Sequence, residues 1–398
     1  MTMGGRDTPD DRLDFTSVDH NYANAFPKLA TLTPEDPLAG LNGLARQISA
    51  AGIRKVSGDV IIDARLYPKL EQGGNVISPI MINDNLVDLT ITPGNLDEKA
   101  KIDWRPYSAA YKVKSLVRTV AAQEPLELKV SSPKRGHIIV EGQIPIDTPR
   151  ALQTFFIQDP PSFARTLFIE ALRREGITVM ASATGLNPEK SLPPEGSYRE
   201  DELVAMHRSL PFAENIKVIL KLSQNQHADT LIYLLAQKHG QKAFEEGVRA
   251  MLPFVQKAGL DDKAVSLADG RGNEPGTLFT PQAVSQLLRY MAKQPYFKIY
   301  HDALPALGVD GTEADAIPPT SPIRGLAYAK SGTVVIGDLL HFRPFQVSEG
   351  LVGYVPGRSG RELVYALYVN NIPINQTEDV FEQDKDVAKM IEAIHNHN

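Results

Sequence analysis

Residues 326–336 read Leu-Ala-Tyr-Ala-Lys-Ser-Gly-Thr-Val-Val-Ile, an apolar strand-like stretch that is interrupted by Lys330-Ser331-Gly332-Thr333. A lysine in mid-strand is unusual, and a glycine inside a strand often marks the close approach of a ligand or of another backbone. One interpretation is an edge strand that binds an added peptide, where Lys330 supplies positive potential and Ser331 and Thr333 bind a carboxylate. The alternative is a lysine that blocks edge aggregation, followed by a glycine in a β-bulge.

A second motif, Ser223-Gln-Asn225, lies between two predicted helices that cover 214–222 and 226–238. In a functional interpretation, the hydroxyl of Ser223 relays a proton while the amide of Asn225 holds a substrate carbonyl. The alternative is that Ser223 or Asn225 is simply the N-cap of the helix that follows.

The composition excludes several classes of function. The 398 residues contain no cysteine, which rules out thiol catalysis, disulfides and thiolate metal sites. The net charge of -6 and the absence of a basic block argue against a nucleic-acid partner. No apolar run reaches the roughly 18–20 residues of a membrane-spanning helix. The polar, acidic N-terminus has no signal-peptide pattern, so the sequence taken literally predicts a cytoplasmic chain.

The order of predicted elements indicates a mixed α+β fold of more than one domain. Two helix-strand units, at 41–63 and 163–184, bracket a β-rich stretch, and the first of them ends in a predicted strand at Val60–Ile62. The C-terminal half predicts an antiparallel sheet, with strands at 326–336, 350–355 and 362–370 and helices packed on it. We therefore expect an N-terminal tail (1–35), a β-rich inserted region (36–200) and a helix-covered sheet domain (201–398).

Several further segments share the order of one known family: Leu32-Thr33-Pro34-Glu35, Ser57-Gly58-Asp59, Asn83-Asp84-Asn85, Thr92-Pro93-Gly94, Gln158-Asp159-Pro160, Asp269-Gly270-Arg271-Gly272 and Asp310-Gly311-Thr312. Together with Ser223-x-Asn225 and Lys330-Ser331-Gly332, the chain resembles the D-Ala-D-Ala carboxypeptidase/endopeptidase family, the class C low-molecular-mass penicillin-binding proteins. The resemblance covers about residues 30–398. One departure is Arg271, where the family has serine, a change expected to alter the rim of the cleft.

The resemblance implies a penicillin-binding-protein/β-lactamase-like domain with a large β-rich insertion, in which 1–35 corresponds to a remnant of the catalytic domain. It implies acyl-enzyme chemistry on peptidoglycan stem peptides, with Ser223, Asn225 and Lys330 as catalytic residues and Ser331, Gly332 and Thr333 as substrate-binding residues. It implies no cofactor and no metal, and a periplasmic or cell-envelope location. β-Lactams are expected partners where the nucleophile is present.

The nucleophile is the missing part of this pattern. The family's Ser-x-x-Lys is expected upstream of residue 30, whereas the one Ser-x-x-Lys here is Ser131-Ser132-Pro133-Lys134, in a strand-like region. We interpret that match as a coincidence. Two hypotheses follow: an enzyme whose front end is absent from the sequence, or a binding homologue that has lost catalysis. A lipase-like esterase on the same fold would also need Ser-x-x-Lys.

Overall fold

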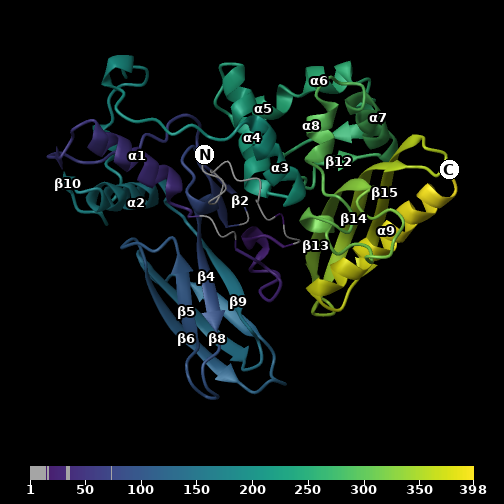
Figure 1. The fold of residues 1–398 in the computed structure, drawn as a ribbon, viewed down its shortest axis with the longest axis horizontal. Helices are drawn as coiled ribbons and strands as arrows, with labels where there is room; N and C mark the ends of the chain where they lie inside the picture. Colours follow the sequence, from purple (N-terminus) through teal and green to yellow (C-terminus); the bar gives the residue numbers. More distant parts are fainter. Residues whose placement is uncertain (1–14, 16–17, 33–35, 73) are drawn as a thin grey trace. The chain divides into compact units, whose positions relative to one another are not determined.

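The computed structural model describes residues 15, 18–32, 36–72 and 74–398. The motif residues Thr33, Pro34 and Glu35, and most of the predicted tail, lie outside the described residues. The chain forms two compact units, His20–Leu210 and Pro211–Asn398, the second of which also includes the segment that ends at Asp19. Each unit has its own hydrophobic core. Figure 1 shows the helices and strands of both units.

The first unit is built from small sheets and two helices. Helix α1 (Ala39–Ala50) packs on α2 (Pro160–Arg174), and a parallel pair joins β1 (Lys55–Val56) to β10 (Thr178–Val179). One three-stranded sheet has the order β5-β4-β9 and another β6-β8-β7. The strands of this unit are β2 (Leu70–Gln72), β3 (Asn75–Ile77), β4 (Leu86–Thr92), β5 (Lys101–Arg105), β6 (Lys112–Val120), β7 (Glu127–Ser131), β8 (His137–Pro145) and β9 (Ala151–Phe156). The predicted β-rich stretch is therefore confirmed, although β2, β3, β6 and β9 were not foreseen.

The strand predicted at Val60–Ile62 is wrong. This segment joins none of the described sheets: the backbone N–H and C=O of Ile62 bond instead to the side chain of Asn187 at 2.8 Å each. Arg165, which is 2% exposed, donates to the carbonyl of Val60 and pairs with Asp59. Apolar β-branched residues gave the strand signal, but the backbone groups of this segment bond to the polar side chains of Asn187 and Arg165.

Part of the predicted tail is ordered within the first unit. The 3-10 turn η1 (His20–Tyr22) buries the imidazole of His20, whose two nitrogens lie 2.8 Å and 3.0 Å from carboxylate oxygens of Asp88 and Asp84. Burial of an imidazole between two carboxylates anchors the turn by charge and hydrogen bonds, which hydrophobic periodicity does not detect.

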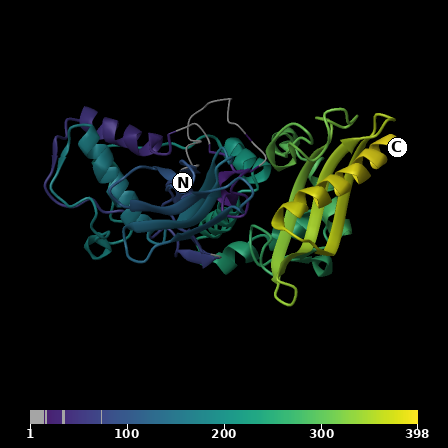
Figure 2. The same cartoon turned by 90° about the horizontal axis from the view of Figure 1, so that it is seen from below.

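The second unit is a three-stranded antiparallel sheet between two layers of helices. Its strands are β13 (Tyr328–Asp338), β14 (Arg343–Pro356) and β15 (Glu362–Pro373), in that order. Because side chains alternate along a strand, Leu351 and Val355 pack with Val387 and Ile391 of α9 (Val380–Asn396), and Tyr354 packs on the other face. Figure 2 shows α9 lying across its face of the sheet.

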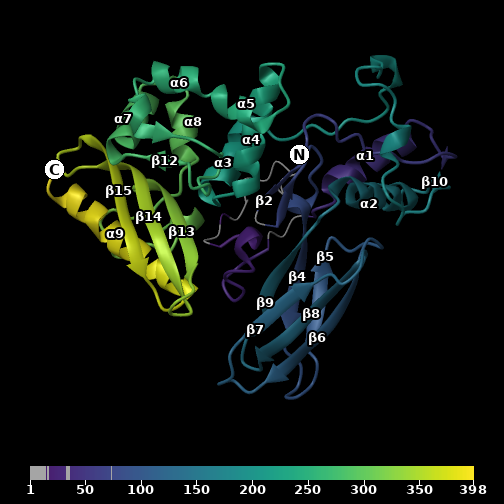
Figure 3. The same cartoon turned by 180° about the vertical axis from the view of Figure 1, so that it is seen from behind.

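The remaining helices lie on the opposite face of the sheet (Figure 3). Tyr354 there packs with Val284 and Leu288 of α7 and donates to the Leu288 carbonyl at 2.8 Å. The helices of this layer are α3 (Phe212–Lys221), α4 (Asn225–Lys238), α5 (Phe244–Arg249), α6 (Leu252–Lys257), α7 (Pro281–Met291) and α8 (Phe297–Asp302). The predicted sheet with helices packed on it is confirmed. Among the described residues, no helix has both the length and the apolar character to cross a membrane.

Candidate active site

Lys330 and Ser223 meet in the second unit. Strand β13 carries Lys330, and its ammonium group donates to the hydroxyl oxygen of Ser223 at 2.8 Å and to the carbonyl of Ser331. Desolvation lowers the pKa of Lys330, while the nearby acids Glu313, Glu349 and Asp384 act in the opposite direction. A lysine that is easier to deprotonate than usual and is bonded to a serine can take part in proton transfer.

Ser223 occupies a sharp junction between α3 and α4. Helix α3 ends at Lys221, Ser223 has a left-handed backbone with φ of 54°, and α4 starts at Asn225. The N-cap is Gln224, whose side chain accepts from the Gln226 N–H at 3.1 Å. The alternative in which Ser223 or Asn225 caps the helix is therefore wrong. Left-handed backbone is unfavourable for serine and is a feature found often at functional sites.

The motif Asp310-Gly311-Thr312 anchors the end of α3. Lys221, 5% exposed, extends its ammonium group to both carboxylate oxygens of Asp310 at 2.8 Å and to the Leu304 carbonyl at 2.7 Å. Gly311 lies so near that an added Cβ would be 2.6 Å from the Lys221 carbonyl oxygen. This fixed contact holds the turn at Ser223 against the loop that carries Thr312.

The motif Asp269-Gly270-Arg271-Gly272 anchors α4 in the same way. The N–H of Gly270 donates to Asp229 at 2.8 Å, one turn after Asn225, and burial raises the pKa of Asp229 to about 6. Arg271, the departure from the family pattern, lies 3.4 Å from Asp229 and 3.6 Å from Asp269. The positive charge of its guanidinium group therefore offsets the negative charges of these two buried acids.

The residues that follow Lys330 on β13 carry hydroxyl groups, and there is open space beside Gly332. The hydroxyl of Ser331 lies 3.3 Å from that of Thr312, and Thr333 lies 2.8 Å from Glu349 on β14. Within the part of the chain that the structure describes, no atom lies within 4 Å of the position that a Cβ would take at Gly332. The β-bulge falls between Val334 and Val335, so the alternative of a bulge at Gly332 is wrong.

Sequence reasoning missed the buried acids beside this strand. Glu313 and Glu349 are 0% and 1% exposed, and burial together with the nearby Glu313 raises the pKa of Asp384 on α9. Asp384 could have been found, because it stands three, four and seven residues before the buried Val387, Ala388 and Ile391. Glu349 could not, because only the strand register places it opposite Thr333.

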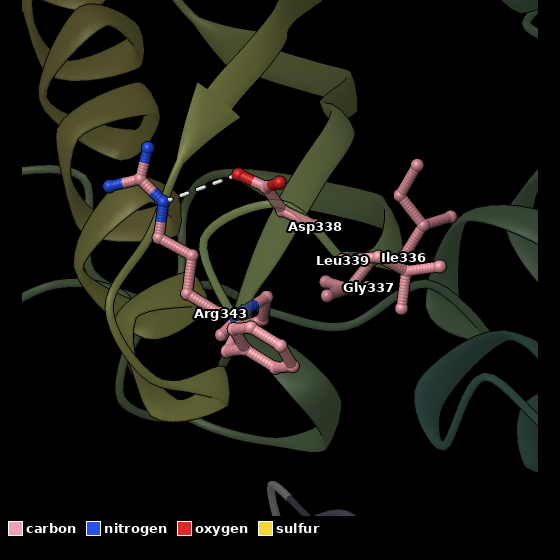
Figure 4. A pocket seen from close by; sticks show the side chains of 8 residues that line it. Ile336, Gly337, Asp338, Leu339 and Arg343 are labelled. Atoms are coloured by element: carbon pink, nitrogen blue, oxygen red, sulfur yellow. Dashed lines mark hydrogen bonds and ion pairs between the residues drawn. The ribbon is translucent and has the colours of Figure 1, made fainter.

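Two other features are not among the contacts of Ser223 and Lys330. Ser131 ends β7, and the Ser132 hydroxyl bonds to the Lys134 carbonyl in the turn that follows, so this Ser-x-x-Lys does not begin a helix. A surface hollow of about 450 Å³ lies at the β13–β14 turn, lined by Ile336, Leu339 and Arg343 among others (Figure 4). None of the six predicted site residues lines it.

Known proteins share both the sequence and the fold. A D-alanyl-D-alanine carboxypeptidase of Actinomadura sp. is 27% identical over 366 residues, which are 86% of this chain and 64% of the relative. The D-alanyl-D-alanine carboxypeptidase DacB of Haemophilus influenzae is 24% identical over 373 residues, 85% of this chain and 70% of the relative. The chain thus spans just under two thirds of the Actinomadura protein.

The crystal structure of penicillin binding protein 4 (dacB) from Haemophilus influenzae has a TM-score of 0.67 and 22% identity, and the match covers 88% of this chain and 78% of that one. That protein has also been solved in complex with a β-lactam. The fold is therefore the mixed α/β fold of penicillin binding protein 4. The model of the D-Ala-D-Ala carboxypeptidase 3 (S13) family matches residues 27–393, and the chain belongs to that family.

Proposed function

We propose that this chain carries the proton-relay and peptide-binding part of a serine-type D-Ala-D-Ala carboxypeptidase or endopeptidase site, which acts on peptidoglycan stem peptides through an acyl-enzyme. The observation that carries the proposal is the 2.8 Å hydrogen bond from Lys330 to Ser223. Membership of the family and the position of Asn225 at the start of α4 support it.

The direction of this hydrogen bond suits a proton relay. The oxygen of Ser223 accepts from Lys330, so the hydroxyl hydrogen of Ser223 is donated in another direction. When the amide bond of a D-Ala-D-Ala peptide breaks, the leaving nitrogen needs a proton. Ser223 can pass its proton to that nitrogen and take one from Lys330, whose lowered pKa favours the transfer.

The edge of β13 suits an extended peptide. Among the described strands, β14 is the neighbour on one side, and on the other side only the start of β13 is bridged, at Tyr328 to Ala306. The backbone from Lys330 to Thr333 can therefore pair with a ligand, and the space beside Gly332 admits a second backbone. Ser331 and Thr333 would bind the terminal carboxylate, next to the charge of Lys330. Such a substrate places the reaction in the cell envelope or periplasm.

A binding protein without catalysis is the second candidate. It is favoured by the position of Ser131, because the one Ser-x-x-Lys of the sequence lies at a strand end and not at the start of a helix. In that case the Lys330 site would bind D-Ala peptides, and no serine would form an acyl-enzyme.

A labelling experiment separates the two candidates. The chain, and a fusion that places the Ser-x-x-Lys segment of a family member before residue 1, are treated with a fluorescent penicillin, and the labelled serine is mapped. A covalent adduct in the fusion that is lost in Lys330→Ala supports the enzyme. Binding of an N-acetylated D-Ala-D-Ala peptide without any adduct in either protein supports the binding homologue. Absence of both binding and labelling refutes the proposed function.

A further inference from the structure

Glu349 is a buried acid whose carboxyl group lies within hydrogen-bond distance of the Thr333 hydroxyl on β13. Glu349 on β14 and Thr333 on β13 are directly opposite in the antiparallel register, and their side-chain oxygens lie 2.8 Å apart. The side chain of Gln346 donates to the same oxygen, Oε2, at 2.6 Å. The other carboxyl oxygen, Oε1, is buried and has no hydrogen-bond partner among the described residues. The Thr333 side chain is exposed, whereas Glu349 is 1% exposed.

The surroundings of Glu349 favour its neutral form. Lys330 faces it from β13, Glu313 from η6 (Gly311–Glu313) and Asp384 from α9. Burial raises the pKa of Tyr365 on β15, and the nearby Glu313 and Asp384 add to this. Burial raises the pKa of Glu349 to about 8 and Glu313 adds to this, while Thr333, Gln346 and Lys330 act in the opposite direction. At neutral pH the group is therefore mainly a carboxylic acid that can donate a hydrogen bond.

A hydroxyl group has one hydrogen to donate, so the state of Glu349 decides what Thr333 can offer. Next to a carboxylate, Thr333 must donate its hydrogen inward and presents lone pairs to a ligand. Next to a neutral acid, Thr333 accepts the hydrogen of Glu349 and can donate its own hydrogen outward. A ligand carboxylate only accepts hydrogen bonds, so it needs the second arrangement.

We propose that Glu349 is a positioning residue which, in its neutral form, turns the Thr333 hydroxyl into a donor and so selects ligands that end in a carboxylate. This inference rests on the proposed function, in which Thr333 binds the C-terminal carboxylate of the peptide. A C-terminal amide brings its own N–H groups and can bond to the lone pairs of Thr333 in either state. The preference for carboxylate over amide should therefore fall about tenfold when Glu349 loses its proton.

The test follows the Thr333 methyl group by NMR in methyl-labelled protein from pH 6 to pH 10. The wild type and a surface control, Glu378→Gln, should show a Thr333 methyl shift that titrates, and Glu349→Gln should not. In the variant the added amide donates to Thr333 permanently, and Gln346 can turn its own amide to accept. An unchanged Thr333 methyl shift across this range in the wild type would overturn the inference, whatever peptide binds.

The second measurement uses an N-acetylated D-Ala-D-Ala peptide and its C-terminal amide, titrated at each pH. The affinity ratio of carboxylate to amide should fall with rising pH in the wild type and stay constant in Glu349→Gln and in Thr333→Val, which keeps the shape but has no hydroxyl. A ratio that falls equally in all proteins would overturn the selection by Glu349. If neither peptide binds while the methyl group titrates, the proposed function fails and the coupling of Glu349 to Thr333 is supported.

Discussion

Lys330 and Ser223 are 107 residues apart in the sequence, yet the ammonium nitrogen of one lies 2.8 Å from the hydroxyl oxygen of the other. The strand β13 and the α3–α4 junction each contribute one partner. Each element is fixed by contacts of its own, so neither partner depends on the other for its place. The pair can therefore be altered one side chain at a time.

Removal of the ammonium group should abolish peptide binding. The site should bind an N-acetylated D-Ala-D-Ala peptide with millimolar to high-micromolar affinity. One charge-assisted contact contributes about 1.5–3 kcal/mol and each of a few strand hydrogen bonds about 1 kcal/mol. The entropy lost on association offsets part of this gain. Lys330→Ala should lose this binding in an NMR titration, because the terminal carboxylate loses its counter-charge. Lys389→Ala, which removes an exposed lysine of α9, is the matched control. Equal shifts in both variants would count against the site.

The left-handed backbone of Ser223 predicts an unusual order of stability. Ser223→Gly and Ser223→Ala both lose the bond to Lys330, but only glycine adopts a φ of 54° without steric cost. The glycine variant should therefore be more stable than the alanine variant by about 0.5–1 kcal/mol in the free energy of unfolding, measured by denaturant titration. At Ser285 inside α7, the order should reverse, with alanine more stable by about 1 kcal/mol. The same order at both positions would mean that Ser223 is unstrained.

Glu349→Gln should change the pH dependence of stability. The pKa of Glu349 rises from 4.5 to about 8 on folding, so between these values the folded protein holds a proton that the unfolded chain has released. Wild-type stability should fall through this window by up to about 1.4 kcal/mol per pH unit, and the loss should be complete above it. Urea titrations at pH 5, 7 and 9 should show Glu349→Gln gaining on the wild type as pH rises. A difference in stability between the two proteins that stays constant with pH would contradict the raised pKa of Glu349.

Replacing Arg165 should lower the stability of the protein more than replacing Asp59, its partner in the ion pair. Its side chain is 2% exposed, whereas that of Asp59 is 38% exposed. Arg165→Met leaves the carbonyls of Val60 and Ser182 without their donor and should cost about 3–5 kcal/mol of unfolding free energy. Asp59→Asn should cost about 1 kcal/mol, because the carbonyl bonds remain. Arg199→Met at an exposed pair is the control, and thermal unfolding of the three variants measures the order.

The sequence predicted the parts of the fold that hydrophobic periodicity determines. The helix predicted at 226–238 is α4 (Asn225–Lys238), and the strand predicted at 362–370 is β15 (Glu362–Pro373). Strand β6 was missed because its outward side chains are charged, with Lys112, Lys114 and Arg118 alternating with less exposed residues. The strand predicted at Val60–Ile62 was wrong because Asn187, far along the sequence, satisfies its backbone.

The candidate site could be predicted only where its residues belong to motifs. Ser223 and Lys330 were each named as catalytic residues from their motifs, and the structure brings them together. The roles of Asn225, Ser331, Gly332 and Thr333 stay predictions. The acids at Glu313 and Glu349 depend on tertiary burial and on strand register, which local sequence does not contain.

Gly270 and Gly311 are constrained by the packing of the fold and not by the chemistry of the site. An added Cβ at Gly270 or at Gly311 would lie 2.6 Å from a helix carbonyl oxygen, of Ala228 or of Lys221. Selection for a folded domain alone would retain both glycines in a descendant that had lost its activity. A side chain added at either glycine would therefore disturb the packing first and the site only through it. The polar pair of Ser223 and Lys330 carries no such steric constraint, so substitutions there report on the site directly.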